Sequence, residues 1–241
     1  MTINYAQARE TMVEQQVRPW DVLDARVLAT LRDVPRHAFV LEEYRALAYA
    51  DLALPIGHGQ TMMKPVVEGR MLQALDVAPG DEVLEIGSGS GFITACLARL
   101  ARDVVSLELN PELATSAHER LAKHGYDGNI RIEIVDAFAW ETDRRFDAIC
   151  VTAAVDTIPS RFTDWLRPGG RLFVIRGQSP VMEAVCVRSP RERVDVNGTD
   201  VSGTNVSGTH VNGLRIESLF ETDVPYLAGA APVAHFQFSQ F

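Results

Sequence analysis

A short apolar run that leads into three closely spaced glycines constrains the fold of this chain more than any other feature. Residues 82–86 (Glu-Val-Leu-Glu-Ile) have the length and composition of a buried strand. Gly87, Gly89 and Gly91 follow, and an apolar segment with helical spacing comes after them. Because glycine lacks a Cβ, such a turn lets a ligand approach the backbone closely. The helix beyond it presents free N–H groups that suit a carboxylate or a phosphate. The segment therefore predicts a ligand-binding strand–turn–helix unit.

From residue 80 onward, apolar strands alternate with helical segments. The further strands that we expect are at 104–107, 130–135, 146–151 and 171–175. The helices that we expect are one through Ala95, Leu97 and Leu100, one at 111–123 and one near 160–166. Such alternation is typical of βαβ units, so we expect an α/β fold with a doubly wound, mostly parallel sheet covered on both faces. Two last strands, 181–187 and 214–224, have no helix between them, which predicts an antiparallel edge.

The residues before this unit predict a helical N-terminal extension. Residues 5–34 are expected to form two helices, the first ending near Pro19 and the second before Pro35, because proline disfavours a helical residue before it. The apolar face of the second helix is expected at Leu23, Val27, Leu28 and Leu31. A short helix at 42–49, an irregular stretch at 51–64 and a helix that begins with Pro65 follow.

We expect one domain made of four parts. These are a helical extension with a substrate loop (1–79), a cofactor-binding core (80–187), a low-complexity insert (188–213), and a C-terminal edge strand and tail (214–241). The insert carries a tandem pentapeptide over 196–213, rich in Gly, Ser, Thr and Asn. It has little apolar area to offset the entropy of ordering, so a mobile surface loop is the expectation.

Charge and hydropathy exclude several classes of protein. The 241 residues include 23 Lys and Arg against 32 Asp and Glu, a formal net charge of −9. This balance argues against a nucleic-acid partner, because phosphate neutralisation needs a basic face. The sequence lacks both an apolar stretch near the ~18 residues of a membrane span and a signal pattern, so no membrane partner and a cytoplasmic location are expected.

The cysteines predict neither a disulfide framework nor a metal site. Cys96, Cys150 and Cys186 lie far apart in apolar surroundings, without a Cys-x-x-Cys pair or a histidine cluster. We expect them to be buried thiols in a reducing compartment.

The spacing of the glycines and of two later acids distinguishes between nucleotide ligands. A dinucleotide fingerprint would place its third glycine at position 92, which is Phe92 here, whereas this glycine stands at 91. Glu108 ends the second predicted strand about twenty residues after the first glycine, where an acid can accept both ribose hydroxyls. Asp136 ends the third predicted strand, where an adenine would reach.

These residues resemble a known family. Residues 84–91 (Leu-Glu-Ile-Gly-Ser-Gly-Ser-Gly), with Glu108 and Asp136, resemble the S-adenosylmethionine site of class I methyltransferases. Flanking segments narrow the resemblance to the protein-L-isoaspartate O-methyltransferase family, over about 9–187 and weakly over 214–229. They are 12–19 (Met-Val-Glu-Gln-Gln-Val-Arg-Pro), 34–40 (Val-Pro-Arg-His-Ala-Phe-Val), 48–51 (Ala-Tyr-Ala-Asp), 54–61 (Leu-Pro-Ile-Gly-His-Gly-Gln-Thr), 146–154 (Phe-Asp-Ala-Ile-Cys-Val-Thr-Ala-Ala) and 166–172 (Leu-Arg-Pro-Gly-Gly-Arg-Leu).

The resemblance implies a Rossmann-like methyltransferase that uses S-adenosylmethionine, releases S-adenosylhomocysteine and takes part in protein repair. Its partners would be damaged proteins or peptides carrying isoaspartate, and the protein would be a monomer. The cofactor residues implied are Glu85, Gly87, Ser88, Gly89, Gly91, Glu108, Leu109, Asp136 and Ala137. The substrate residues implied are His58, Gln60, Thr61, Met62 and Met63.

Two positions depart from the family pattern. The family has Ile-Ser after Gly-x-Gly-x-Thr, and the serine is its active-site residue, whereas Met62 and Met63 stand here. The catalytic residue therefore stays unassigned, and the acceptor is open. The turn after the third strand reads Val135-Asp136-Ala137 in place of Gly-Asp-Gly, which keeps the acid.

Three functions stay open at this point. They are a carboxyl methyltransferase for isoaspartyl residues, a diverged methyltransferase for another acceptor such as a small molecule, and a cofactor-binding module without catalysis. A carboxylate acceptor is ionised at pH 7 and needs no general base. A phenol or amine acceptor would need one, for which His58 is the candidate, whereas His37 is expected to be structural.

Overall fold

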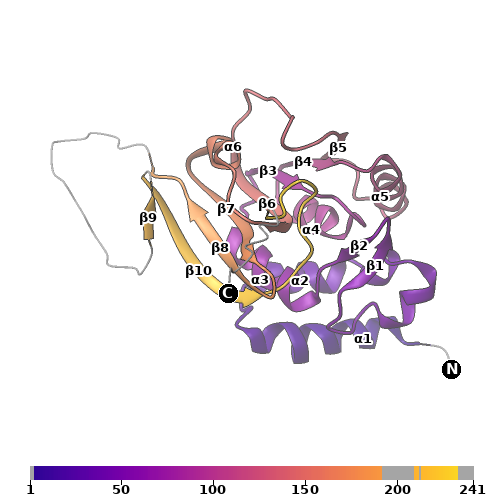
Figure 1. Cartoon of the computed structure of the whole chain (residues 1–241). Coiled ribbons are helices and arrows are strands. Elements are labelled where there is room, and N and C mark those ends of the chain that lie inside the picture. Colours follow the sequence, from indigo (N-terminus) through magenta and orange to yellow (C-terminus); the bar gives the residue numbers. More distant parts are fainter. Residues whose placement is uncertain (1–2, 192–208, 212, 233–241) are drawn as a thin grey trace, which may run out of the picture.

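The computed structural model describes residues 3–191, 209–211 and 213–232. An eight-stranded sheet with strand order β5-β4-β3-β6-β7-β8-β10-β9 runs through this part of the chain (Figure 1). The strands are β3 (Glu82–Ile86), β4 (Asp103–Glu108), β5 (Ile130–Ile134), β6 (Phe146–Val155), β7 (Leu166–Gln178), β8 (Val181–Arg188), β9 (Thr209–Val211) and β10 (Leu214–Thr222). β3 to β7 pair in parallel, and β8, β10 and β9 add an antiparallel edge. The predicted mixed sheet is confirmed.

The path of the chain through the sheet creates a place for a ligand. From β3 the chain proceeds outward to β4 and β5, and then returns to β6 on the other side of β3. In open α/β sheets, ligands bind beyond the carboxyl ends of the strands at such a reversal. The site is therefore expected where β3 and β6 end, beside β4.

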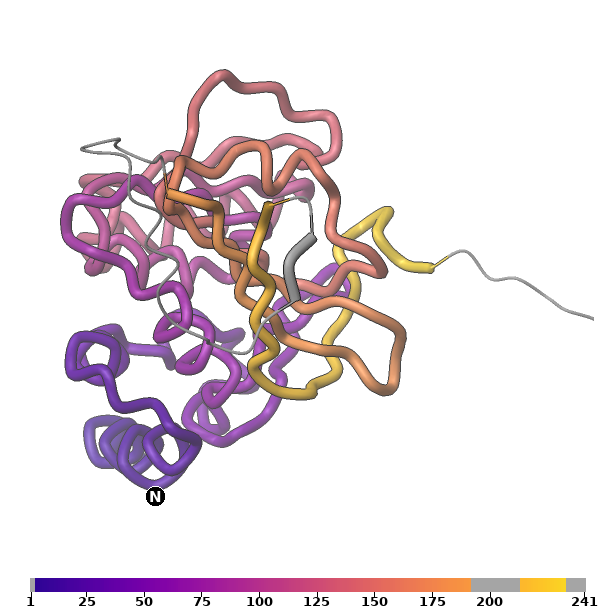
Figure 2. The backbone as a smooth tube through the Cα atoms, turned by 90° about the vertical axis from the view of Figure 1, so that its left-hand side faces the viewer, coloured from indigo at the N-terminus to yellow at the C-terminus, as the bar shows by residue number. Residues whose placement is uncertain are grey.

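Helices flank the sheet and precede it. The α-helices are α1 (Tyr5–Met12), α2 (Ala25–Asp33), α3 (Pro65–Leu75), α4 (Phe92–Leu100), α5 (Pro111–Lys123) and α6 (Ser160–Asp164). A π-helical turn at Val13–Val17 and a 3₁₀ turn at Arg18–Trp20 continue α1, and 3₁₀ turns lie at Arg36–Ala38 and Glu42–Leu47. Both views place the N-terminal helices below the sheet and the β5–β6 connection above it (Figures 1 and 2). Each described helix is too short or too polar to cross a membrane.

Alternate side chains of the strands point into two separate cores. Val83, Val104 and Phe173 belong to the core that packs against the N-terminal helices, α3 and α4. Their neighbours Leu84 and Val105 belong to the core on the other face, which is closed by aromatic side chains after β5 and around α6. Because successive strand residues face opposite sides, a strand buried on both faces reads as a continuous apolar run. This is the pattern that predicted these strands.

Four details differ from the predictions. Leu23 lies before α2 and is 68% exposed, because Asp24 caps the helix and starts it at Ala25. The stretch expected to be irregular contains a hairpin, β1 (Leu54–Gly57) and β2 (Gln60–Met62). β7 begins at Leu166 instead of Arg171, and residues 168–170 (Pro-Gly-Gly) lie at an irregularity in its pairing with β6. Residues 209–211 of the insert pair with β10, while 192–208 and 212 lie outside the described residues.

The contact between α3 and the N-terminal segment predicts the effect of Gly69→Ala. A Cβ at Gly69 would lie 2.6 Å from Cγ1 of Val17, a buried β-branched side chain with little freedom to move. Overpacking costs ~1–3 kcal/mol, and the higher helix propensity of alanine offsets up to ~1 kcal/mol of this cost. We therefore expect the free energy of unfolding, measured in urea, to fall by about 1–2 kcal/mol. The control is Gly80→Ala, whose Cβ would meet no atom within 4 Å. Equal stability of the two variants would contradict this packing.

Candidate functional site

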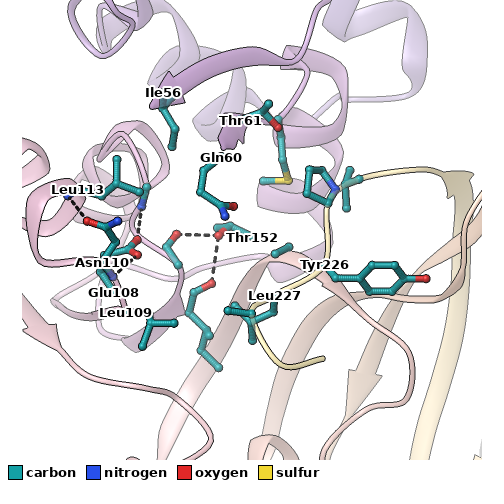
Figure 3. Close-up of a pocket in the computed structure, with 18 of the residues that line it drawn as sticks. Ile56, Gln60, Thr61, Glu108, Leu109, Asn110, Leu113, Thr152, Tyr226 and Leu227 are labelled. Atoms are coloured by element: carbon teal, nitrogen blue, oxygen red, sulfur yellow. Dashed lines mark hydrogen bonds between the residues drawn. The ribbon is translucent and has the colours of Figure 1, made fainter. Parts of the chain in front are cut away.

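A cavity of about 370 Å³ lies where the central strands end (Figure 3). Its walls come from four parts of the chain: the glycine turn, the ends of β4 to β6, the β1–β2 hairpin and the segment 222–228 after β10. This volume falls in the ordinary range of small-molecule sites, ~300–1,000 Å³. The carboxyl-end position agrees with the reversal in strand order.

Close backbone contacts shape the glycine turn. Gly87 has φ of 95°, and a Cβ there would lie 2.5 Å from the Thr152 hydroxyl oxygen. Gly91 has φ of 87°, and its Cβ would lie 3.2 Å from that of Ala117 on α5. Both positions therefore require glycine, and the turn leads directly into α4 at Phe92.

Glu85 lies beneath this turn. Its side chain is fully buried and accepts hydrogen bonds from the hydroxyls of Thr94 (2.6 Å) and Ser106 (2.5 Å). Burial raises the pKa of Glu85 to about 7, although the two hydroxyl hydrogen bonds oppose the shift. The resemblance placed Glu85 at the cofactor, whereas the structure places it under the cavity wall, joining β3 to α4 and β4.

Glu108 organises the neighbouring wall. One carboxylate oxygen accepts the Gly89 N–H at 2.8 Å, and the other accepts the Asn110 N–H at 3.0 Å. Asn110 in turn caps α5 through its side chain, which accepts from the N–H groups of Glu112 and Leu113. Each carboxylate oxygen keeps a further lone pair for a ligand. Glu108 thus joins the glycine turn to the start of α5 and lines the cavity.

The other predicted cofactor residues divide between the cavity and its surroundings. Leu109, Asp136 and Ala137 line the cavity, and Asp136 holds its turn by accepting the Phe138 N–H at 2.8 Å. Ser88 does not line it. Ser88 faces a smaller cavity of about 40 Å³ between the glycine turn and the hairpin.

The hairpin brings together most of the predicted substrate residues. His58, Gln60, Thr61 and Met63 line the main cavity, and Gln60 extends toward Thr152 (Figure 3). Met62 lines only the smaller cavity. At the hairpin tip, His58 Nε2 lies 3.3 Å from a carboxylate oxygen of Glu112 on α5.

Several lining residues were not identified from the sequence. Thr152 follows the apolar part of β6, and the carbonyl oxygens of Ile86 (3.0 Å) and Gly87 (2.6 Å) share its one hydroxyl hydrogen. Its position near the carboxyl end of a central strand could have indicated it. The segment 222–228 had no such signal, because it reaches the cavity through a bridge between Tyr226 and Ala154.

His37 lies outside the site. Its Nδ1 is 2.7 Å from the Tyr49 hydroxyl, and its ring stacks on Tyr5 with centroids 4.2 Å apart. Burial and the nearby positive charges of Arg9, Arg45 and His124 lower its pKa. The cysteines are buried and free, and the described residues hold no cluster that could bind a metal.

Comparisons with known proteins agree on one family. A family model described as protein-L-isoaspartate(D-aspartate) O-methyltransferase matches residues 7–196. A relative from Syntrophobacter fumaroxidans, protein-L-isoaspartate O-methyltransferase 1, is 43% identical over 79% of this chain and 89% of its own. Another from Aeropyrum pernix, protein-L-isoaspartate O-methyltransferase, is 42% identical over 80% of this chain and 77% of its own.

Solved structures support the same fold. A crystal structure from Plasmodium falciparum, assigned to the protein-L-isoaspartate O-methyltransferases and in complex with S-adenosyl-L-homocysteine, aligns with a TM-score of 0.73. The alignment covers 94% of this chain and 99% of that one at 20% identity. At this identity the likeness concerns the fold, which is the Rossmann-like methyltransferase fold that the resemblance implied.

The buried carboxyl of Glu85 predicts a pH dependence of stability. Its folded pKa of about 7 lies above the ordinary glutamate value of 4.5, so the folded state holds the proton more tightly than the unfolded state. Stability should therefore fall as the pH rises through this window and level off above it. Glu85→Gln lacks the ionisation, so its stability relative to wild type should rise between pH 5 and 7, by about 3 kcal/mol at most. Urea unfolding at several pH values measures this, and a constant difference would refute it.

Proposed function

Because the chain belongs to the protein-L-isoaspartate(D-aspartate) O-methyltransferase family, we propose that it transfers the methyl group of S-adenosylmethionine to isoaspartyl carboxylates. Damaged proteins or peptides are the partners, and protein repair is the role. The observation that carries this function is the family match over residues 7–196, which includes the glycine turn, Glu108 and the hairpin of one cavity.

The residues around the cavity suit the cofactor. The glycine turn leaves its backbone open beside the cavity, and Glu108 offers carboxylate oxygens to the ribose hydroxyls. Asp136 and Ala137 would hold the adenine, with Leu109 beside them. When bound, S-adenosylmethionine supplies a methyl group already activated by its sulfonium. Glu85 contributes through the turn that it supports, because it lies beneath the cavity wall.

The chain has to position the acceptor rather than deprotonate it. A carboxylate is ionised at pH 7, so no general base is required. Near-attack alignment can supply ~7–11 kcal/mol of a barrier, and exclusion of water strengthens the electrostatic interactions in the site. Gln60, Thr61 and Met63 line the cavity from the hairpin and would face the substrate carboxylate. His58 would act as a base only for an acceptor that must lose a proton.

Location and assembly are part of the proposal. The buried, free thiols of Cys96, Cys150 and Cys186 support a reducing compartment such as the cytoplasm. The acidic balance of the chain supports protein rather than nucleic-acid partners. We propose a monomer.

An assay with a matched pair of peptides tests the function. The protein is incubated with S-adenosylmethionine and a peptide that contains either isoaspartate or aspartate at one position. We expect S-adenosylhomocysteine to form faster with the isoaspartyl peptide. Equal background rates for both peptides, with binding of the cofactor intact, would favour a diverged acceptor, for which a cell extract serves as the source of candidates.

Removal of the Glu108 carboxylate should weaken cofactor binding. A hydrogen bond to a charged group is worth ~1.5–3 kcal/mol, so Glu108→Ala should lower the affinity for S-adenosylhomocysteine by about one to two decades. Calorimetry measures the change. The control is Glu119→Ala, since Glu119 is an exposed acid on α5 that does not line the cavity. Unchanged affinity for Glu108→Ala would contradict the ribose assignment.

Met63 predicts weak turnover and favours the second candidate, a diverged acceptor. A thioether is a weak acceptor and donates no hydrogen bond, so it cannot replace a hydroxyl beside the substrate carboxylate. Met63→Ser together with Met62→Ile should raise isoaspartyl turnover by about one to two decades. The double variant and wild type are compared in the same peptide assay. Robust wild-type turnover that the double variant does not improve would show that Thr61 and backbone groups suffice.

A further inference from the structure

A buried ion pair lies between the hairpin and the glycine turn, outside the main cavity. Arg36 is fully buried and Glu68 is 1% exposed, and Arg36 Nη1 donates to Glu68. Glu68 lies on α3, which begins two residues after Met63. Burial raises the pKa of Glu68, and the adjacent charge of Arg36 opposes the shift.

The remaining contacts of Arg36 reach both halves of the site. Its Nη2 donates to the carbonyl oxygen of Met63 at 2.7 Å, and its Nε donates to that of Ala48 at 2.9 Å. The guanidinium carbon lies 4.9 Å from the ring centroid of Phe92, the residue with which the glycine turn enters α4. One planar group therefore connects the backbone of the substrate segment to the first residue of α4.

A second observation concerns the cavity of about 40 Å³ beside this pair. Glu68, Ser88 and Thr61 are among its lining residues. Within the described residues, one carboxylate oxygen of Glu68 and the hydroxyl of Ser88 are buried without a hydrogen-bond partner. Buried polar atoms normally have partners, and a polar cavity of this size can hold a water molecule.

Stability alone gives little reason for such a pair. Desolvation of two charges offsets much of their attraction, and hydrophobic replacements of a buried pair are often as stable. The geometry of an arginine fork, in contrast, can hold several oxygens in fixed relative positions. Through its contacts with Met63 and Phe92, Arg36 can fix the substrate segment relative to the start of α4.

We propose that Arg36 and Glu68 are positioning residues for methyl transfer, which together with a water between Glu68 and Ser88 hold residues 61–63 against the glycine turn. This inference rests on the proposed function. The pair touches neither cofactor nor acceptor; it sets where the hairpin presents the acceptor to the activated methyl group. Alignment errors of ~1 Å can lower a rate about 100-fold, so a small shift of this segment matters.

The test uses Arg36→Lys in the full-length protein. Lysine keeps the charge for Glu68 but lacks the fork that also reaches Met63 and Ala48. We expect a folded variant with cofactor affinity within about threefold of wild type, kcat lowered about 10- to 100-fold, and faster hydrogen exchange at the amides of residues 61–64. The control is Arg99→Lys, since Arg99 on α4 pairs with Asp33 at the surface and should tolerate the exchange. Unchanged kcat and unchanged exchange in Arg36→Lys would overturn the positioning role.

Further measurements separate the possible failures. If Arg36→Lys does not fold, the double variant Arg36→Met with Glu68→Leu takes its place. Lower kcat and faster exchange at residues 61–64 are again expected, and no change in either would overturn the positioning role. If the wild type lacks isoaspartyl turnover, the proposed function fails, and hydrogen exchange alone decides the positioning role. A high-resolution crystal structure of the wild type should show a water within hydrogen-bond distance of Glu68 and Ser88. A dry cavity would overturn that part of the proposal.

Discussion

The turn after β3 is the constraint on which the rest of the site depends. It approaches Thr152 on one side and Ala117 on the other, which leaves no room for a Cβ at Gly87 and little at Gly91, and both residues have a positive φ. Hydrogen bonds then fix it from two directions. Glu85 joins the strand below it to α4 and β4, and Glu108 accepts the Gly89 N–H from the neighbouring strand. A buried acid and a cavity-lining acid therefore shape one turn, and the helices that follow β3 and β4 take their starting points from it.

The sequence predicted the elements whose determinants are local. β3 and α5 have the predicted bounds, because a short, mostly apolar segment followed by glycines specifies the one and a proline after an asparagine cap starts the other. The hairpin at 54–62 was not predicted, since its strands are short and its tip combines glycines with His58 in a left-handed conformation. The spacing of apolar residues also predicted that Leu23 belongs to the second helix. Asp24 caps that helix, however, so it begins at Ala25 and leaves Leu23 outside.

Contacts between distant segments explain what sequence reasoning missed in the site. Motif spacing predicted that Glu108 and Asp136 lie at one edge of the sheet, where strand ends meet, and both line the cavity. It could not show that the segment 222–228 returns to line the cavity, or that Arg36 reaches Met63 across 27 positions. Neither could it separate Glu85, beneath the wall, from the residues that line the cavity. Both Glu85 and Glu108 are buried, and which of them faces the cavity depends on tertiary packing that motif spacing does not record.

Met63 differs from the serine of the family pattern in its side chain, while Arg36 still holds its backbone. The carbonyl of Met63 accepts from Arg36 whatever side chain the residue carries, so the path of the hairpin does not depend on a serine at this position. The cavity therefore keeps its cofactor wall and its hairpin wall, and loses only a hydroxyl between them. Methyl transfer to a carboxylate needs alignment and no proton acceptor, so such a site can retain its chemistry while its preference among acceptors changes. On this view the glycine turn determines the methyl donor, and residues 60–63 determine which acceptor is presented to it.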